Sequence, residues 1–293
     1  TGNIVVHIAG GTYILDDTLT FDERDSASNG FCIKYVGEGE TVISGGQKIG
    51  SFTLHDEEKN IYYAKVPKGM LFRQLYVDGK KMTRARSNTD FSTRIVGASR
   101  FNEDGTMIPE HLNYWGEDSL VPASYGEIYL NANEFQNFNN LTDVELHVLT
   151  AWVKNVLRVK AAETKDGITT IRIQDNENRL IFNRLHPNID GYSHMSTHDF
   201  VYYIENAYEL IDGDNEWYLD ESTYTVYIKV PVNTDINSSG VVIPRLEKLM
   251  STGTTDGSKI QNLSFEGLTF RYSNWTVPST DGLVDVQAGM YAN

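Results

Sequence analysis

The stretch Asn262–Trp275 limits the possible folds of this chain more than any other. Its sequence predicts two very short strands around a Glu-Gly corner, where Gly267 allows a sharp turn without a penalty from a Cβ atom. The apolar side chains form one pair on each of two faces: Leu263 with Phe265, and Leu268 with Phe270. Such a corner cannot bury these side chains alone. It needs similar turns stacked on it, which predicts one rung of a right-handed parallel β-helix.

Short strands of the same kind recur at the start of the chain. They are expected at residues 4–8, 12–15, 18–21, 31–36 and 41–44, separated by Gly, Asp and Asn turns. Strands this short with no helix between them predict an all-β chain. We therefore expect residues 1–51 to form the first coils of the β-helix and residues 233–293 to resume it.

Residues 52–232 have a different pattern, which predicts an inserted β-rich module, a sandwich or an open barrel. Hairpins are expected at Asp78-Gly79, at residues 165–167, and between residues 216–220 and 224–228. Helical spacing predicts a short helix over Tyr202–Ile211, and another is expected near residues 109–115. Insertions into solenoids lie on one face, often the binding face, so the module is expected to shape one wall of a groove.

The net charge of the chain limits which classes of molecule it can bind. With 40 acidic against 25 basic residues, the net charge is −15, which argues against nucleic acid and anionic membrane surfaces. A neutral polysaccharide or oligosaccharide, or a cation, fits better, although acidity can also serve only solubility. No apolar run reaches the roughly 18 residues of a membrane span.

Several phrases of the sequence resemble one group of proteins, in order along nearly the whole chain. They lie at residues 10–13 with 42–46, 74–86, 204–220 and 265–288. The group is the right-handed parallel β-helix glycoside hydrolases with a flanking β-sandwich, of the β-xylosidase type or the α-fucosidase/xylanase type. This chain departs from the group at two turns, Asp214-Asn215 and Ser222–Tyr224, which leaves the expected fold unchanged.

The resemblance implies an exported carbohydrate-active hydrolase that is secreted, periplasmic or at the cell surface. In the resembled hydrolases the catalytic carboxylates lie on coils beyond the insertion. We therefore expect this chain to be an N-terminal fragment, with the catalytic pair beyond Asn293 and no activity alone. Asp285, a charged residue in an apolar strand pattern, is the weak catalytic candidate within the chain, and a solvated strand face is its alternative role.

Five residues are candidates for substrate binding. Trp275 offers an indole that can stack on a sugar, and Asn274 offers an amide for hydroxyl groups; capping of the coil stack is the alternative for the tryptophan. Trp115 belongs to an irregular loop and is expected over a groove or in the core. Arg84 and Arg86 share one strand face and suit a carboxylate such as a uronate, or ion pairs with acids of the module. Trp152 and Trp217 are expected in the core.

No cofactor is expected. His194 and His198 have zinc-like spacing, but the intervening Glu of the metalloprotease motif is missing. Calcium in a β-helix groove would be compatible with the acidity, yet no residues can be assigned to it. Two other functions stay open: a non-catalytic glycan-binding or surface protein, and a polysaccharide lyase. Paired carboxylates on later coils favour the hydrolase, their absence favours the binding protein, and calcium-binding Asp clusters beside a basic residue favour the lyase.

Overall fold

The computed structural model describes residues 2–87, 92–108, 124–149, 154–182, 200–254 and 257–276. These residues are nearly all in strands and loops; their only α-helix is α1 (Asp175–Phe182). The prediction of an all-β chain is confirmed. The described residues form two compact units: unit 1 draws on 1–53, 66–83 and 233–276, and unit 2 on 54–65 and 84–232. The predicted boundaries at 51/52 and 232/233 stay a prediction.

Unit 1 contains three sheets. Its strands are β1 (Ile4–Ile8), β2 (Gly11–Ile14), β3 (Leu19–Phe21), β4 (Ile33–Ser44), β5 (Gly46–Ile49), β8 (Tyr76–Val77), β9 (Lys80–Lys81), β20 (Val241–Pro244), β21 (Met250–Thr252) and β22 (Leu263–Arg271). β5, β20, β8 and β9 pair antiparallel, whereas β3 pairs parallel with β21.

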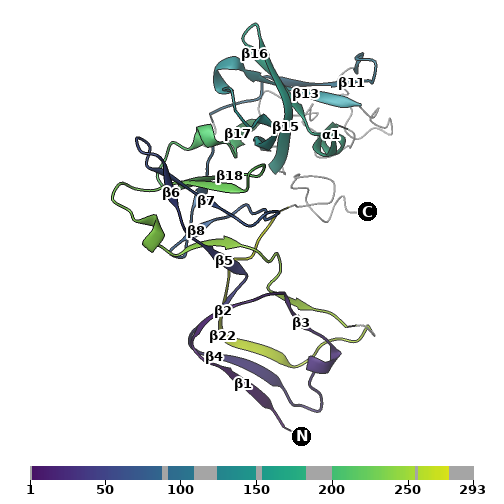
Figure 1. The fold of residues 1–293 in the computed structure, drawn as a ribbon. Coiled ribbons are helices and arrows are strands. Elements are labelled where there is room, and N and C mark those ends of the chain that lie inside the picture. Colours follow the sequence, from purple (N-terminus) through teal and green to yellow (C-terminus); the bar gives the residue numbers. More distant parts are fainter. Residues whose placement is uncertain are drawn as a thin grey trace. The chain divides into compact units, whose positions relative to one another are not determined.

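The third sheet of unit 1 is parallel and includes β22, the strand part of the Asn262–Trp275 stretch (Figure 1). β22 pairs along β4, and β4 pairs on its other side with β1 and then β2. Equivalent residues therefore stack in rows, such as Val6, Tyr35 and Phe265. The rings of Tyr35 and Phe265 are stacked at 5.3 Å, and Phe21 of β3 meets both edge-on. The predicted stacking of this rung on similar strands is thus present.

Two glycines shape the corner in β22: Gly267 lies in the corner itself, and Gly37 lies opposite it on β4. The register between β22 and β4 shifts between Glu266 and Leu268, and Gly267 adopts φ +66° there. A Cβ on Gly37 would lie 2.3 Å from the carbonyl oxygen of Gly267, so the two backbones touch directly. Glycine is required at both positions, for its left-handed conformation at Gly267 and for the close approach at Gly37.

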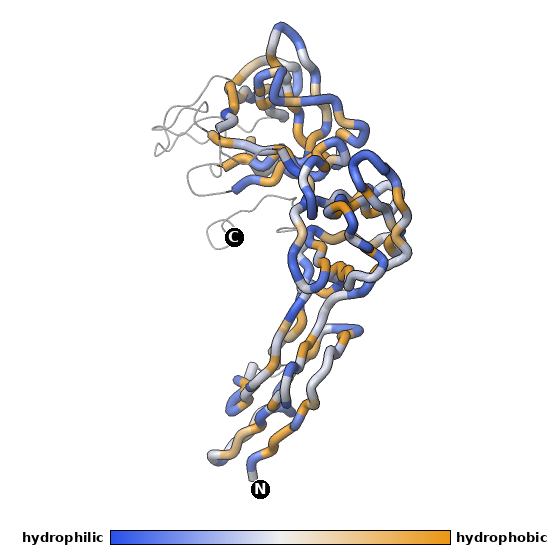
Figure 2. Tube along the Cα trace, turned by 90° about the vertical axis from the view of Figure 1, so that its left-hand side faces the viewer, coloured by the Kyte–Doolittle hydropathy of each residue, from blue (hydrophilic) through white to orange (hydrophobic). Residues whose placement is uncertain are grey.

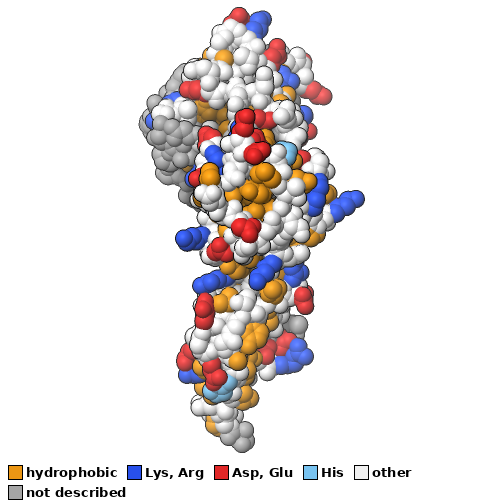
Figure 3. Space-filling view, turned by 60° about the vertical axis from the view of Figure 1, so that its left-hand side comes forward, with side chains coloured by type: hydrophobic (Ala, Val, Ile, Leu, Met, Phe, Trp, Pro, Cys, Tyr) orange, Lys and Arg blue, Asp and Glu red, His pale blue; other side chains and the backbone are white. Residues whose placement is uncertain are grey.

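Much of this parallel sheet is exposed. Ile4, Ile14 and Phe270 each keep 40% or more of their surface accessible. Figure 2 shows hydrophobic and hydrophilic residues mixed along its strands, and Figure 3 shows hydrophobic side chains reaching the surface among charges of both signs.

Unit 2 contains a seven-stranded antiparallel sheet in the order β12-β11-β13-β16-β15-β14-β17 and a second sheet in the order β10-β18-β19-β7-β6. The strands of the larger sheet are β11 (Gly97–Phe101), β12 (Met107–Ile108), β13 (Tyr125–Asn131), β14 (Glu145–Leu149), β15 (Lys154–Lys165), β16 (Ile168–Ile173) and β17 (Val201–Glu205). Those of the smaller sheet are β6 (Thr53–Asp56), β7 (Ile61–Lys65), β10 (Thr83–Arg84), β18 (Glu216–Asp220) and β19 (Thr225–Lys229).

A single hydrophobic cluster fills unit 2. It joins aliphatic residues of the larger sheet, such as Ile128, Leu146 and Ile171, to Ile61 and Tyr218 of the smaller one. Trp217 is fully buried, so its expected core position is confirmed.

The structure confirms the three predicted hairpins and contradicts one predicted helix. The Asp78-Gly79 and Asp166-Gly167 hairpins are confirmed: all four turn residues have φ between +47° and +81°. The hairpin of residues 216–228 is confirmed as β18 and β19. The predicted helix over Tyr202–Ile211 is wrong, because Val201–Glu205 form strand β17 against β14 and only a short 3-10 turn follows. The helix expected near 109–115 lies outside the described residues.

Among the described residues, no helix is long and apolar enough to cross a membrane.

The glycine contact in unit 1 yields a stability prediction. Replacing Gly37 by Ala should lower the free energy of unfolding by about 1–3 kcal/mol, because the new methyl group forces β4 and β22 apart. The measurement is urea-induced unfolding. Gly50→Ala is the matched control, since a Cβ there meets nothing within 4 Å. Equal unfolding curves for the two variants would contradict the close-contact explanation.

Candidate functional site

A buried charged cluster occupies one face of β14. Glu145 and His147 alternate along this strand on the face opposite Leu146 and Val148, and all four are buried. Nη1 of Arg84 donates to Oε2 of Glu145 at 2.8 Å and to Oε1 of Glu205 at 3.3 Å. Nε2 of His147 lies 3.1 Å from Oε2 of Glu145 and 3.8 Å from Oε1 of Glu205. Arg84 therefore supplies one positive charge shared by two buried carboxylates.

The protonation of His147 follows from its surroundings. Burial lowers the pKa of His147, because the interior penalises the charged imidazolium; the carboxylates of Glu145 and Glu205 oppose this shift but are the smaller effect. The ring stacks on Tyr203 at 4.6 Å. A neutral ring that donates from Nε2 to Glu145 leaves Nδ1 as a bare acceptor, and the described residues offer it no hydrogen-bond partner.

Three residues of this cluster have the chemistry of metal ligands. Glu145, His147 and Glu205 offer one ligand atom each, all within 4.8 Å of one another. A metal ion there would have to compete with the guanidinium of Arg84, which already bonds both carboxylates. The donor set therefore fits an internal ion-pair network better than a cation site.

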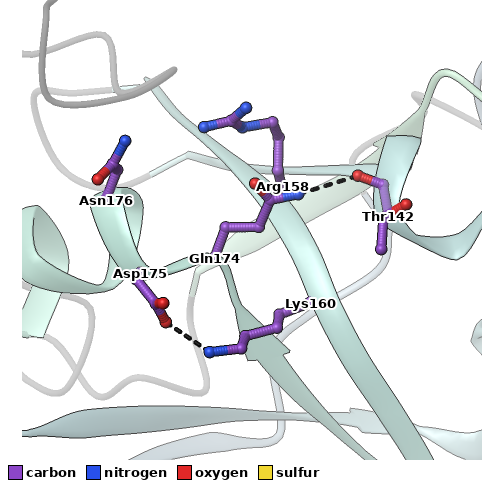
Figure 4. A pocket seen from close by; sticks show the side chains of 6 residues that line it. All are labelled: Thr142, Arg158, Lys160, Gln174, Asp175 and Asn176. Carbon is purple, nitrogen blue, oxygen red and sulfur yellow. Dashed lines mark hydrogen bonds and ion pairs between the residues drawn. The ribbon is translucent and has the colours of Figure 1, made fainter. Parts of the chain in front are cut away.

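An open polar pocket lies elsewhere in unit 2 (Figure 4). It has a volume of about 350 Å³ and is lined only by residues with polar side chains: Thr142, Arg158, Lys160, Gln174, Asp175 and Asn176. They come from the 3-10 turn Leu141–Asp143, from β15, and from the junction of β16 with α1. Nε2 of Gln174 donates to the carbonyl oxygen of Thr142 at 3.1 Å, and Nζ of Lys160 lies 2.6 Å from Oδ1 of Asp175.

A second, smaller pocket lies in unit 1 and has a volume of about 200 Å³. Part of its lining is a row across the parallel sheet, formed by Ile14, Ser44 and Arg271 on neighbouring strands. Tyr272 adds an aromatic ring, which meets Tyr76 edge-on at 4.8 Å. This pocket combines a basic group with an aromatic surface.

The structure places the two predicted arginines in different environments. Arg84 is buried in the charged cluster, in the ion pairs that were the alternative to uronate binding. Arg86 is half-buried, with its guanidinium 6.0 Å from the ring centroid of Tyr203. Both thus lie beside the cluster, and contact of either with a substrate stays a prediction.

Asn274 and Trp275 differ in accessibility. Asn274 is buried: its Nδ2 donates to the carbonyl oxygen of Leu71 at 2.9 Å, and its Oδ1 accepts from the backbone N–H of Trp275 at 2.9 Å. Trp275 keeps 40% of its surface exposed, with the guanidinium of Arg73 lying 5.5 Å from its ring. Of the two, the indole has the surface that a sugar could reach.

The remaining predicted residues lie outside the described part of the chain. These are Trp115, Trp152, Asp285, His194 and His198. Their roles stay predictions.

Sequence reasoning missed the charged cluster and the polar pocket. The cluster had one local signal, since Glu145 and His147 are two residues apart in an alternating sequence, and such residues share one face of a strand. The pocket had none, because its six residues come from three elements and form no motif.

The fold is that of an all-β chain, and comparison with known proteins relates it to glycoside hydrolases. A solved structure titled "Glycoside hydrolase" is similar over 94% of this chain, with a TM-score of 0.76 and 25% sequence identity. The chain covers 44% of that structure and so spans less than half of its length. Another, titled "The complex structure of XylC with xylose", is 13% identical over 95% of this chain and 32% of that one; its TM-score of 0.31 is too low to support an argument.

The sequence also matches a described family. Residues 59–230, more than half of the chain, match the GH141 insertion domain, and the chain belongs to this family. No curated protein matches the chain.

The charged cluster yields a stability prediction. Arg84→Met should cost about 3–5 kcal/mol of unfolding free energy, because it leaves two buried carboxylates without their cation. Denaturant unfolding measures this loss. Arg86→Met is the control and should cost only about 1 kcal/mol, because half-buried Arg86 loses a single cation–π contact. If both variants lose the same small amount, the cluster does not support the fold.

A pH prediction follows from His147. The unfolded chain binds a proton at this histidine near its ordinary pKa of 6.5, whereas the folded chain resists it. The stability from neutral His147 is therefore present above pH 6.5 and lost as the pH falls below that value towards the lowered pKa. His147→Gln should flatten the stability–pH profile on the acid side of pH 6.5.

The matched control for this titration is His55→Gln, because His55 is exposed. Unfolding free energies at pH values from 7.5 down to about 5 give the profile. A His147→Gln profile as steep as that of His55→Gln would contradict the assignment.

Proposed function

We propose that this chain is part of an exported glycoside hydrolase that acts on plant or microbial polysaccharide. The observation that carries the proposal is the structural similarity to a glycoside hydrolase over 94% of the chain. The GH141 insertion domain within residues 59–230 supports it independently. The proposed location is secreted, periplasmic or at the cell surface.

We further propose that unit 1 belongs to a right-handed parallel β-helix. The rungs β1 with β2, β4, and β22 stack in parallel register, and β3 with β21 forms a second parallel pair. The smaller pocket lies across three of these strands. A β-helix hydrolase of the β-xylosidase or α-fucosidase/xylanase type would present its sugar-binding residues on such a face, with the exposed indole of Trp275 available for stacking.

The proposed reaction needs two carboxyl groups that face each other across the glycosidic bond, about 5–9.5 Å apart. We propose that this pair lies on coils beyond Asn293, with Asp285 as the only candidate within the chain. The similar glycoside hydrolase is more than twice as long as the segment this chain matches, which leaves room for those coils.

A comparison of two proteins tests the function. The 293-residue chain and a longer product of the same gene are incubated with a set of plant polysaccharides, and new reducing ends are measured. We expect hydrolysis by the longer protein and none by the chain alone. In the longer protein, Asp285→Ala should abolish turnover if this residue is catalytic, and unchanged turnover would remove it from the mechanism.

The same assay separates the alternatives. Products with an unsaturated uronate, seen by ultraviolet absorbance, would identify a lyase. Binding by the longer protein without any cleavage would identify a non-catalytic glycan-binding protein. Either result would overturn the proposed hydrolase.

A further inference from the structure

The geometry points to a second sugar-binding site, in the polar pocket of unit 2 beside α1. We infer that this pocket binds a neutral sugar unit of a polysaccharide chain. The inference rests on the proposed function only for the choice of carbohydrate as ligand class. The shape, charge and hydrogen-bonding groups of the pocket carry the rest.

The pocket has the size of a small ligand site. Its volume of about 350 Å³ lies near the lower end of the range of about 300–1,000 Å³ for small-molecule sites. Its lining residues belong to one unit and to secondary-structure elements or their junctions. A site built in this way holds the backbone that carries its polar groups in a fixed position.

Buried Glu177 fixes the most important donor. Nε of Arg158 donates to Oε1 of Glu177, and Nη2 of Arg158 donates to Oε2 at 3.2 Å. Glu177 is fully buried, whereas Arg158 is partly exposed. Among the described residues, Nη1 of this guanidinium has no partner, and Figure 4 shows the guanidinium extending toward the side where Asn176 lies.

Two further groups are free to bind a ligand. The amide of Asn176 and the hydroxyl of Thr142 are exposed and have no hydrogen-bond partner among the described residues. Together with Nη1 of Arg158 they offer both donors and acceptors. Sugar hydroxyl groups both donate and accept, so they match such a mixed set.

The charges of the pocket favour a neutral sugar over a uronate. Glu177 already pairs with Arg158, and Asp175 already pairs with Lys160. The first turn of α1 also carries these two acids, which complement the positive end of the helix. A ligand carboxylate would therefore meet no unpaired cation, whereas a neutral hydroxyl-bearing ring needs none.

Calorimetric titration of the 293-residue chain tests the inference. The probes are cellohexaose, xylohexaose and mannohexaose as neutral oligosaccharides, and hexagalacturonate as the acidic one. Asn176→Ala and Thr142→Val should each weaken neutral-sugar binding about 3- to 10-fold, the effect of losing one hydrogen bond. Asn137→Ala is the matched control, an exposed asparagine of the same unit outside the pocket, and should bind like the unchanged chain.

Each other outcome overturns the inference. If the pocket variants and the control bind equally well, the sugar binds elsewhere. If no neutral probe binds at millimolar concentration, the pocket is not a sugar site. If hexagalacturonate binds more tightly than every neutral probe, the ligand class is wrong. Because hydrolysis is not measured here, these failures differ from a failure of the proposed function, which shows as missing turnover in the longer protein.

Discussion

The fold of unit 2 depends on one positive charge placed between two buried carboxylates. Arg84 reaches Glu145, 61 residues away, and Glu205, 121 residues away, and so joins β10, β14 and β17. β14 is buried on both faces, with the hydrophobic cluster on one side and the charged cluster on the other. The strand can be buried in this way only because the carboxylates have a cation and His147 stays neutral. The same interaction joins two of the phrases on which the family resemblance rests, residues 74–86 and residues 204–220.

Unit 1 is held by a different constraint. Its parallel strands stack so closely that backbone meets backbone at Gly37 and Gly267. Because the strands pair in parallel register, equivalent side chains lie in rows, and the ring of Tyr35 stacks on that of Phe265 in the neighbouring rung. Buried ion pairs thus join the strands of unit 2, whereas two glycines allow the strands of unit 1 to stack closely.

Local chemistry was predictable from the sequence, whereas the long-range pairing within unit 2 was not. The Asp78-Gly79 and Asp166-Gly167 turns were found because two adjacent residues determine them. The helix over Tyr202–Ile211 was mispredicted because its apolar spacing fits a helix, while pairing with β14 decides the outcome. Arg84 was recognised as a candidate, but its partners were not, since nothing local connects it to Glu145 or Glu205. The pocket beside α1 was missed for the same reason.

The outer edge of β22 has a consequence for handling this chain. β22 pairs with β4 on one side, and among the described residues no strand covers its other side. An open strand edge presents unpaired N–H and C=O groups, to which another strand readily adds. The exposed ring of Phe270 on the same strand adds apolar surface to such a contact. The feature that lets rungs stack within one molecule therefore also favours edge-to-edge association between molecules wherever the next rung is missing.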